Sequence, residues 1–137
     1  MSPTPVQWQP LVEAALQARK RAYAPYSRYA VGAALLTEDG DIVTGANVEN
    51  AVYPLSLCAE RVAVARAVHE GHTRFKALVV ATANGGTPCG ACRQTLREFA
   101  AALPILVVDG QGRVVLETDL AELLPYAFSS SDLPNGR

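Results

Sequence analysis

The sequence lacks the features typical of secreted, membrane-spanning and nucleic-acid-binding proteins. Its 12 Lys and Arg residues against 13 Asp and Glu residues leave a formal net charge of −1. It therefore has no basic excess of the kind that binds DNA or RNA. No apolar run approaches the ~20 residues that a membrane helix needs, and the first ten residues show no basic segment followed by an apolar stretch. We therefore expect a cytoplasmic protein without a nucleic-acid or membrane partner.

Cysteine and histidine are scarce, with three and two residues respectively. Three thiols in a chain without a secretion signal fit a reducing compartment, where cysteines bind metal or react instead of forming disulfides. Half of the 137 residues are hydrophobic, which is enough for a core in a chain of one domain's length. We predict a single domain over residues 1–137, with residues 129–137 as a loose C-terminal tail.

Hydrophobic spacing predicts nine elements in the order α-β-β-α-β-α-β-β-α. Only three residues separate the last two strands, too few for a parallel crossover, so we expect that pair to be antiparallel. The order fits an α/β fold, a three-layer α/β/α sandwich around a mixed five-stranded sheet. The predicted helices span Leu11–Ala22, Cys58–Glu70, Cys89–Ala102 and a short segment capped by Asp119, and the predicted strands span 29–37, 42–48, 76–82, 105–109 and 113–117.

Every cysteine lies at the predicted start of a helix. Cys58 opens one helix, and Cys89 and Cys92 open another with the spacing that places two side chains on one face. The partial positive charge of a helix N-terminus favours the thiolate, which is the form that binds metal. Three thiolates around a tetrahedral zinc leave one position open, which is typical of a catalytic zinc. A carboxylate two residues beyond Cys58, Glu60, could move protons to and from water at that position.

These residues resemble a known family. Zinc-dependent nucleobase deaminases carry a metal ligand, one residue and a glutamate, followed later by Pro-Cys-x-x-Cys, and this chain has Cys58-Ala59-Glu60 and Pro88-Cys89-Gly90-Ala91-Cys92. Further stretches in the same order are similar to homotetrameric cytidine deaminases, from about Leu11 to Leu133. These stretches are Ala24-Pro25-Tyr26-Ser27, Val31-Gly32-Ala33-Ala34-Leu35, Asn47-Val48-Glu49-Asn50-Ala51 and Cys89-Gly90-Ala91-Cys92-Arg93-Gln94.

The resemblance implies a catalytic centre with one Zn²⁺ per chain. Its ligands would be Cys58, Cys89 and Cys92, and Glu60 would carry protons while water adds to C4 of a cytosine ring. Arg61 would donate to the thiolates, offsetting the excess negative charge that three thiolates bring to a divalent ion. The implied reaction converts free cytidine and 2′-deoxycytidine to uridine and 2′-deoxyuridine, as in pyrimidine salvage.

The resemblance also implies how the nucleoside is held. Asn47 and Glu49 would hydrogen-bond the sugar, and the backbone N–H of Ala59 would contact the base. Tyr29 and Phe128 would be pocket aromatics, with Phe128 supplied by a neighbouring subunit of a homotetramer whose active sites are shared.

Two positions differ from the family pattern and affect the expected substrate range. The family usually has a small polar residue or cysteine where this chain has Val52, and phenylalanine where it has Tyr29. Both changes alter the polarity expected of the pocket. A different small aminopyrimidine, such as a nucleoside antibiotic, therefore remains open as a substrate, although the expected sugar contacts favour a nucleoside.

Functions of other classes also remain open at this point. A structural zinc module would use His69 or His72 as a fourth ligand, but these histidines fit better as cations near a helix C-terminus. A thiol redox protein would use the Cys-x-x-Cys pair after a first strand, which this order of elements does not give. A polynucleotide deaminase is opposed by the charge balance, by the cysteine as first ligand and by the antiparallel last hairpin.

Overall fold

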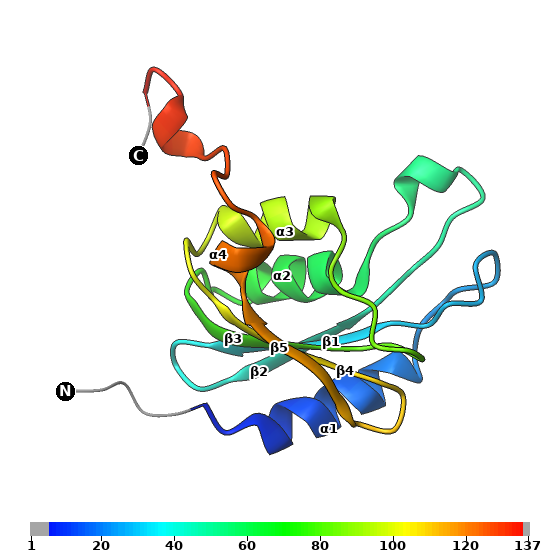
Figure 1. Ribbon diagram of the computed structural model, residues 1–137. Coiled ribbons are helices and arrows are strands. Elements are labelled where there is room, and N and C mark those ends of the chain that lie inside the picture. The colour runs from blue at the N-terminus through cyan, green and yellow to red at the C-terminus, as the bar shows by residue number, and fades with distance from the viewer. Residues whose placement is uncertain (1–5, 136–137) are drawn as a thin grey trace.

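The computed structural model describes residues 6–135 and shows helices packed on a five-stranded sheet (Figure 1). The mixed five-stranded sheet predicted from the sequence is confirmed. Its elements are α1 (Trp8–Arg19), β1 (Gly32–Thr37), β2 (Ile42–Ala46), η1 (Tyr53–Leu55), α2 (Ala59–His69), β3 (Phe75–Ala81), α3 (Gly90–Arg97), β4 (Pro104–Val108), β5 (Val114–Asp119), α4 (Leu120–Leu123) and η2 (Ser130–Asp132).

The strands lie in the order β2-β1-β3-β4-β5. The pair β3 and β4 is parallel and is connected through α3, whereas the other three pairs are antiparallel. The last hairpin, β4 and β5, runs antiparallel from Pro104 opposite Asp119 to Val108 opposite Val114.

The central strands of the sheet are buried on both faces, because α1 covers one face and α2, α3 and α4 cover the other (Figure 1), whereas the edge strand β5 is largely exposed. Alternate residues of each strand point to opposite faces. In β3, Leu78 and Val80 join the cluster under α2, while Val79 and Ala81 join the cluster under α1. Strands buried on both faces are expected to be almost continuously apolar, as the sequence of β3 and β4 is.

Among the predicted boundaries that are wrong by three residues or more, three lie where the chain beyond the boundary contacts another segment. The helix α1 ends at Arg19 and not at Ala22, because the Tyr23 backbone forms a bridge with Val48. The first strand begins at Gly32 and not at Tyr29, because the Asn47 side chain hydrogen-bonds the backbone of residues 29–31. The helix α3 ends at Arg97, beyond which the Phe99 ring packs edge-on against Phe75 with centroids 5.6 Å apart.

Two helix boundaries follow the sequence signals closely. The helix α2 ends in a Schellman motif, in which Gly71 has φ +95° and His72 N–H donates to the Ala67 carbonyl. Asp119 caps α4, accepting a hydrogen bond from the Ala121 N–H at 2.9 Å. At the C-terminal end, Ser129 and Asp132 form a capping box around η2, and residues 136–137 of the predicted tail lie outside the described residues.

The sheet brings distant segments to one edge. Because β1 is antiparallel to both neighbours, its first residue, Gly32, pairs with Ala46 at the end of β2 and with Ala81 at the end of β3. The segments 26–31, 47–49 and 82–87 therefore meet at this edge, to which α2 and α3 also present their N-termini. Ligands of open α/β sheets bind at such an edge.

Gly45 lets α2 approach this edge closely. A Cβ atom at Gly45 would lie 2.5 Å from the Ala59 carbonyl oxygen and 2.5 Å from the Ala63 nitrogen, both of which are backbone atoms of α2. We expect Gly45→Ala to reduce the free energy of unfolding by about 1–3 kcal/mol, the usual cost of overpacking, measured by urea denaturation. Gly90→Ala is the matched control, since a Cβ there meets nothing within 4 Å. Equal stability of the two variants would contradict the close contact.

Candidate active site

The three cysteines converge where α2 and α3 begin. Cys58 is the N-cap of α2 and Cys89 the N-cap of α3, while Cys92 lies one turn into α3. The Sγ atoms are 3.7 Å apart for Cys58 and Cys89 and 3.4 Å apart for Cys89 and Cys92, and all three lie within 4.8 Å of one another. Neither histidine belongs to a metal-binding cluster among residues 6–135, and His72 instead contacts Asp39 and Asp41.

The pKa values of Cys58 and Cys92 are shifted in opposite directions. A hydrogen bond from Cys92, with smaller contributions from Arg61 and Cys89, lowers the pKa of Cys58 to about 5. The pKa of Cys92 is raised, because this thiol donates to the Cys58 thiolate and is buried. Cys58 is therefore a thiolate at neutral pH, and a cation is needed to draw the proton from Cys92 as well.

The donor set fits zinc. Tetrahedral zinc with Zn–S bonds of about 2.3 Å places its sulfur ligands about 3.8 Å apart, close to the Sγ separations of this cluster. Arg61 donates from Nη2 to the Ser56 carbonyl at 3.2 Å and to Cys58 Sγ at 3.7 Å. Its Nε is buried and has no hydrogen-bond partner within residues 6–135. This guanidinium therefore has the position and charge to offset a third thiolate.

Glu60 is a buried carboxyl group next to the thiols, with 4% of its surface exposed. Burial raises the pKa of Glu60, and the Cys58 thiolate raises it further, while a hydrogen bond from the Cys92 thiol acts in the opposite direction. A carboxyl group whose pKa is raised binds a proton more readily than an ordinary glutamate, which suits a group that must accept a proton and release it again. These are the properties required of a proton carrier.

Glu60, Cys58 and Cys89 line a cavity of about 290 Å³ at the edge of the sheet. This volume is at the small end of the range for ligand pockets. Four further residues that the sequence assigned to substrate binding line the same cavity, namely Tyr29, Asn47, Glu49 and Ala59. Segments separated by up to 60 residues in the chain thus form one pocket.

Asn47 is 8% exposed and clamps the segment before β1. Its Oδ1 accepts from the Val31 N–H at 2.9 Å, and its Nδ2 donates to the Tyr29 carbonyl at 2.9 Å. This clamp explains why residues 29–31 lie outside the strand that their apolar character predicted. The amide keeps a second N–H and a second lone pair for a ligand.

Glu49 presents an ionised carboxylate to the pocket. Its Oε1 accepts from the N–H groups of Tyr26 and Ser27 at 2.9 and 3.0 Å, and its Oε2 accepts from the Ser27 hydroxyl. These hydrogen bonds, led by that of the Ser27 side chain, lower the pKa of Glu49. An ionised carboxylate is only an acceptor, so it suits a ligand that offers hydroxyl groups.

Phe128 lies apart from the other predicted site residues. Its ring is 58% exposed, and its carbonyl accepts from Gln94 Nε2 at 2.8 Å. The pocket is also lined by residues that the sequence did not indicate, among them Ser27, Thr82 and Gly86. Ser27 stands within a motif quoted above, whereas Thr82 and Gly86 reach the pocket only through the pairing of β3 with β1, for which the sequence gives no local signal.

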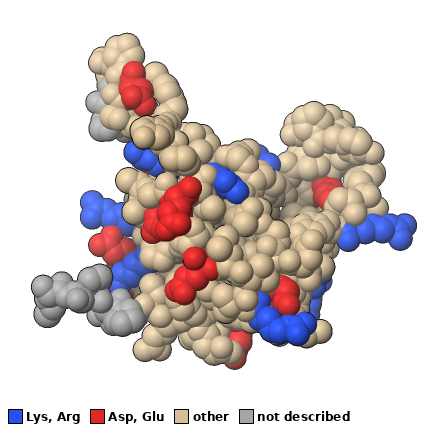
Figure 2. Space-filling view, in the orientation of Figure 1, with Lys and Arg blue, Asp and Glu red and all other residues tan. Residues whose placement is uncertain are grey.

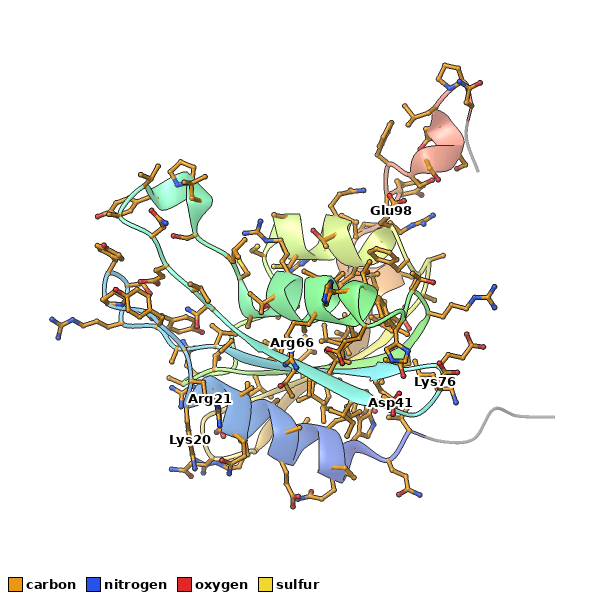
Figure 3. The ribbon with its side chains drawn as sticks, turned by 180° about the vertical axis from the view of Figure 1, so that it is seen from behind. Lys20, Arg21, Asp41, Arg66, Lys76 and Glu98 are labelled. Atoms are coloured by element: carbon orange, nitrogen blue, oxygen red, sulfur yellow. The ribbon has the colours of Figure 1, made fainter. Side chains whose placement is uncertain are left out.

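In the metal-free protein, we expect Arg61→Met to raise the pKa of Cys58 above about 5, because the thiolate loses a hydrogen-bond donor and a neighbouring positive charge. The hydrogen bond from Cys92 remains, so the pKa should stay below the usual 9.0. The pH dependence of Cys58 alkylation, followed by mass spectrometry, measures the shift. Arg66→Met on the same helix is the control, since Arg66 donates to the Thr44 carbonyl and lies between α2 and β2 (Figure 3). An unchanged profile for Arg61→Met would contradict its contact with the thiolate.

Comparison with known proteins agrees with this geometry. Residues 6–107 match the family described as the cytidine and deoxycytidylate deaminase zinc-binding region. A cytidine deaminase of Sporosarcina psychrophila is 47% identical over 126 residues, which cover 90% of this chain and 92% of that protein. A cytidine deaminase of Mycobacterium tuberculosis is 45% identical over 134 residues, covering 96% and 97%.

A solved structure is similar throughout its length. The crystal structure of cytidine deaminase from Burkholderia pseudomallei aligns with a TM-score of 0.85 and 44% identity, covering 90% of this chain and 100% of that one. The cluster Cys58, Cys89 and Cys92 is suited to hold the zinc ion that this family binds. With this fold, this thiol cluster and these relatives, the chain belongs to the cytidine and deoxycytidylate deaminase family of zinc-dependent hydrolases.

Proposed function

We propose that the chain catalyses the hydrolytic deamination of free cytidine and 2′-deoxycytidine to uridine and 2′-deoxyuridine, with release of ammonia. The observation that carries this proposal is the buried Glu60, whose pKa is raised, beside a cluster of three thiols, two of which line the same pocket. The cytidine deaminases similar to this chain support the choice of a cytosine nucleoside.

In this proposal Cys58, Cys89 and Cys92 hold the metal. A zinc ion bound there acts as a Lewis acid and makes water a better nucleophile near neutral pH. Glu60 accepts a proton as the water oxygen bonds to C4 of the cytosine ring, and it delivers that proton to N3. It then takes the remaining hydroxyl proton and passes it to the amino group, so that the C4–N bond breaks and ammonia leaves.

The other pocket residues bind and orient the nucleoside. Glu49 accepts hydrogen bonds from sugar hydroxyls, and the free N–H and lone pair of Asn47 complete the contact. The Ala59 backbone N–H, at the first turn of α2, donates to the base, and the Tyr29 ring borders the pocket. A contact to a hydroxyl that ribose and deoxyribose share would serve both nucleosides.

We further propose that the protein is a cytoplasmic homotetramer with shared active sites. Large apolar side chains are exposed on η1 and near the C-terminus, including Tyr53 at 70% and Leu55 at 62%, and the exposed Phe128 could enter a neighbouring pocket. Three free thiols that must stay reduced to bind metal favour the cytoplasm. Light scattering combined with assays during dilution tests the assembly, and full turnover by a monomer would contradict shared sites.

We also propose that the chain forms one domain and that its partner is a free nucleoside and not a polynucleotide. The helices on both faces of the sheet support a single three-layer α/β/α sandwich, with the residues from 129 onward as its C-terminal tail. Acidic and basic side chains are interspersed on the face shown in Figure 2, without a continuous basic stripe, which supports a free nucleoside over a polynucleotide. Among the described residues no helix is long and apolar enough to cross a membrane.

Ultraviolet absorbance of purified protein with cytidine and with 2′-deoxycytidine tests the reaction, and metal analysis of the same sample tests the cofactor. Loss of the cytosine absorbance with about one zinc per chain is the expected result. Bound zinc without turnover of either nucleoside would contradict the proposal and favour another aminopyrimidine, such as a nucleoside antibiotic, as substrate.

A further inference from the structure

The Tyr29 hydroxyl joins two segments that lie far apart in the sequence. Its Oη donates to Asn84 Oδ1 at 2.6 Å, across 55 residues. Tyr29 precedes β1, whereas Asn84 belongs to the loop of residues 84–87 that follows β3. The contact depends on the phenol, because a phenylalanine at this position would have no donor for Asn84.

The loop 84–87 is held from inside and outside. On the inner side, the buried Thr82 Oγ1 accepts from the N–H groups of Gly85 at 2.7 Å and Gly86 at 2.8 Å. On the outer side, Asn84 is bound by Tyr29, with a longer contact of 3.5 Å from the Thr82 hydroxyl to the same Oδ1. Removing the phenol leaves Asn84 Oδ1 with that long contact, while Thr87 at the other end of the loop keeps a hydrogen bond from Arg93 Nη2 at 3.2 Å.

The absence of a side chain at Gly86 leaves room for the phenol. A Cβ at Gly86 would lie 2.5 Å from Tyr29 Oη, while its next neighbours would be Tyr29 Cζ at 3.7 Å and Asn84 Oδ1 at 3.9 Å. The hydroxyl oxygen is therefore the one close atom, and a phenylalanine ring would leave only ordinary van der Waals contacts. A tyrosine at position 29 thus favours a residue without a side chain at position 86, because a Cβ there would displace the phenol.

The loop also forms part of the proposed active site. Gly86 and Thr87 line the same cavity as Tyr29, and the chain continues directly through Pro88 to the thiol of Cys89. We propose that the Tyr29 hydroxyl is a positioning group that, through Asn84, holds the loop 84–87 against the substrate and so sets the fit of the nucleoside. This inference rests on the proposed function for its substrate and on the contacts above for its geometry.

Steady-state kinetics with cytidine test the positioning role. Tyr29→Phe keeps the ring and removes the hydroxyl, so we expect KM to rise about three- to tenfold, the range for one lost hydrogen bond, with kcat and zinc content within about twofold. Asn84→Ala should raise KM by a similar factor, and the double variant should add nothing further. Tyr126→Phe is the matched control, because that ring is fully exposed. Unchanged KM in Tyr29→Phe, or independent effects of the two substitutions, would overturn the proposal.

Thermal unfolding of a second set of variants tests the geometry without any substrate. Gly86→Ala should lower Tm in the Tyr29 protein and leave it nearly unchanged in the Tyr29→Phe background, where the clashing oxygen is gone. An equal loss of Tm in both backgrounds would overturn the contact between Tyr29 and Gly86. Absence of cytidine turnover by the wild type would overturn the proposed function alone, since the unfolding comparison decides the contact by itself.

Discussion

Glu60→Gln is expected to reduce kcat for cytidine by about 10²- to 10⁴-fold, the usual contribution of a positioned proton carrier, while zinc remains bound. Glutamine has nearly the shape of glutamate but cannot accept the proton that the attacking water must lose. Glu60 does not belong to the cluster of three cysteines that would hold the metal, so the metal content should stay at the wild-type value. Steady-state kinetics and metal analysis of the same preparation measure both quantities.

Glu70→Gln is the matched control, because Glu70 caps the opposite end of α2 and is exposed. Its kcat should equal that of the wild type. Near-normal turnover by Glu60→Gln would remove Glu60 from the mechanism. Loss of zinc together with turnover would show that the carboxylate supports the metal site instead of the proton transfer.

The same variant should change how the stability of the metal-free protein depends on pH. Because the pKa of Glu60 is raised in the folded state, the folded protein retains this proton at pH values where the unfolded chain has released it. The free energy of unfolding therefore falls as pH rises above about 4.5, where an ordinary glutamate ionises. Glu60→Gln removes this contribution, so its stability relative to the wild type should increase with pH.

Local sequence signals were sufficient for each half of the thiol cluster, whereas the meeting of Cys58 with Cys89, 31 positions further along the chain, was implied by the family resemblance. Two cysteines three residues apart share a helix face wherever that helix lies, and Cys58 with Glu60 is likewise set by the start of one helix. The signals from Gly71 after α2 and Asp119 before α4 are equally local, because each residue forms a helix cap with the adjacent turn. These features could be predicted, since they depend on few residues close in the chain.

The walls of the pocket could not be predicted in the same way. The segment 29–31 is apolar and was expected to continue a strand, but the Asn47 side chain satisfies its backbone groups from another strand end. The link from Tyr29 to Asn84 and the place of Thr82 depend on which strands pair. Such contacts follow from the register of the sheet, and a single sequence carries no local pattern for it.

Removing zinc with a chelator is expected to abolish turnover while the protein stays folded. The core consists of two buried apolar clusters, one on each face of the sheet, and neither depends on the thiols for its packing. Activity should return when zinc is added back to the wild type. Circular dichroism and the cytidine assay before and after chelation distinguish this result from a structural zinc site, whose removal would unfold the chain.

Cys92→Ala should prevent that recovery, because only two of the three thiols remain to hold the ion. Ala91→Ser, at the exposed neighbouring position, is the control and should recover fully.

In the wild type, zinc must displace the proton of Cys92, whose pKa is raised, so zinc affinity should rise about tenfold per pH unit for each proton released. The affinity should fall more steeply as pH drops through about 5, where Cys58 also takes up a proton. Competition with a chromophoric chelator across this range measures the slope, and a pH-independent affinity would contradict binding through these thiolates.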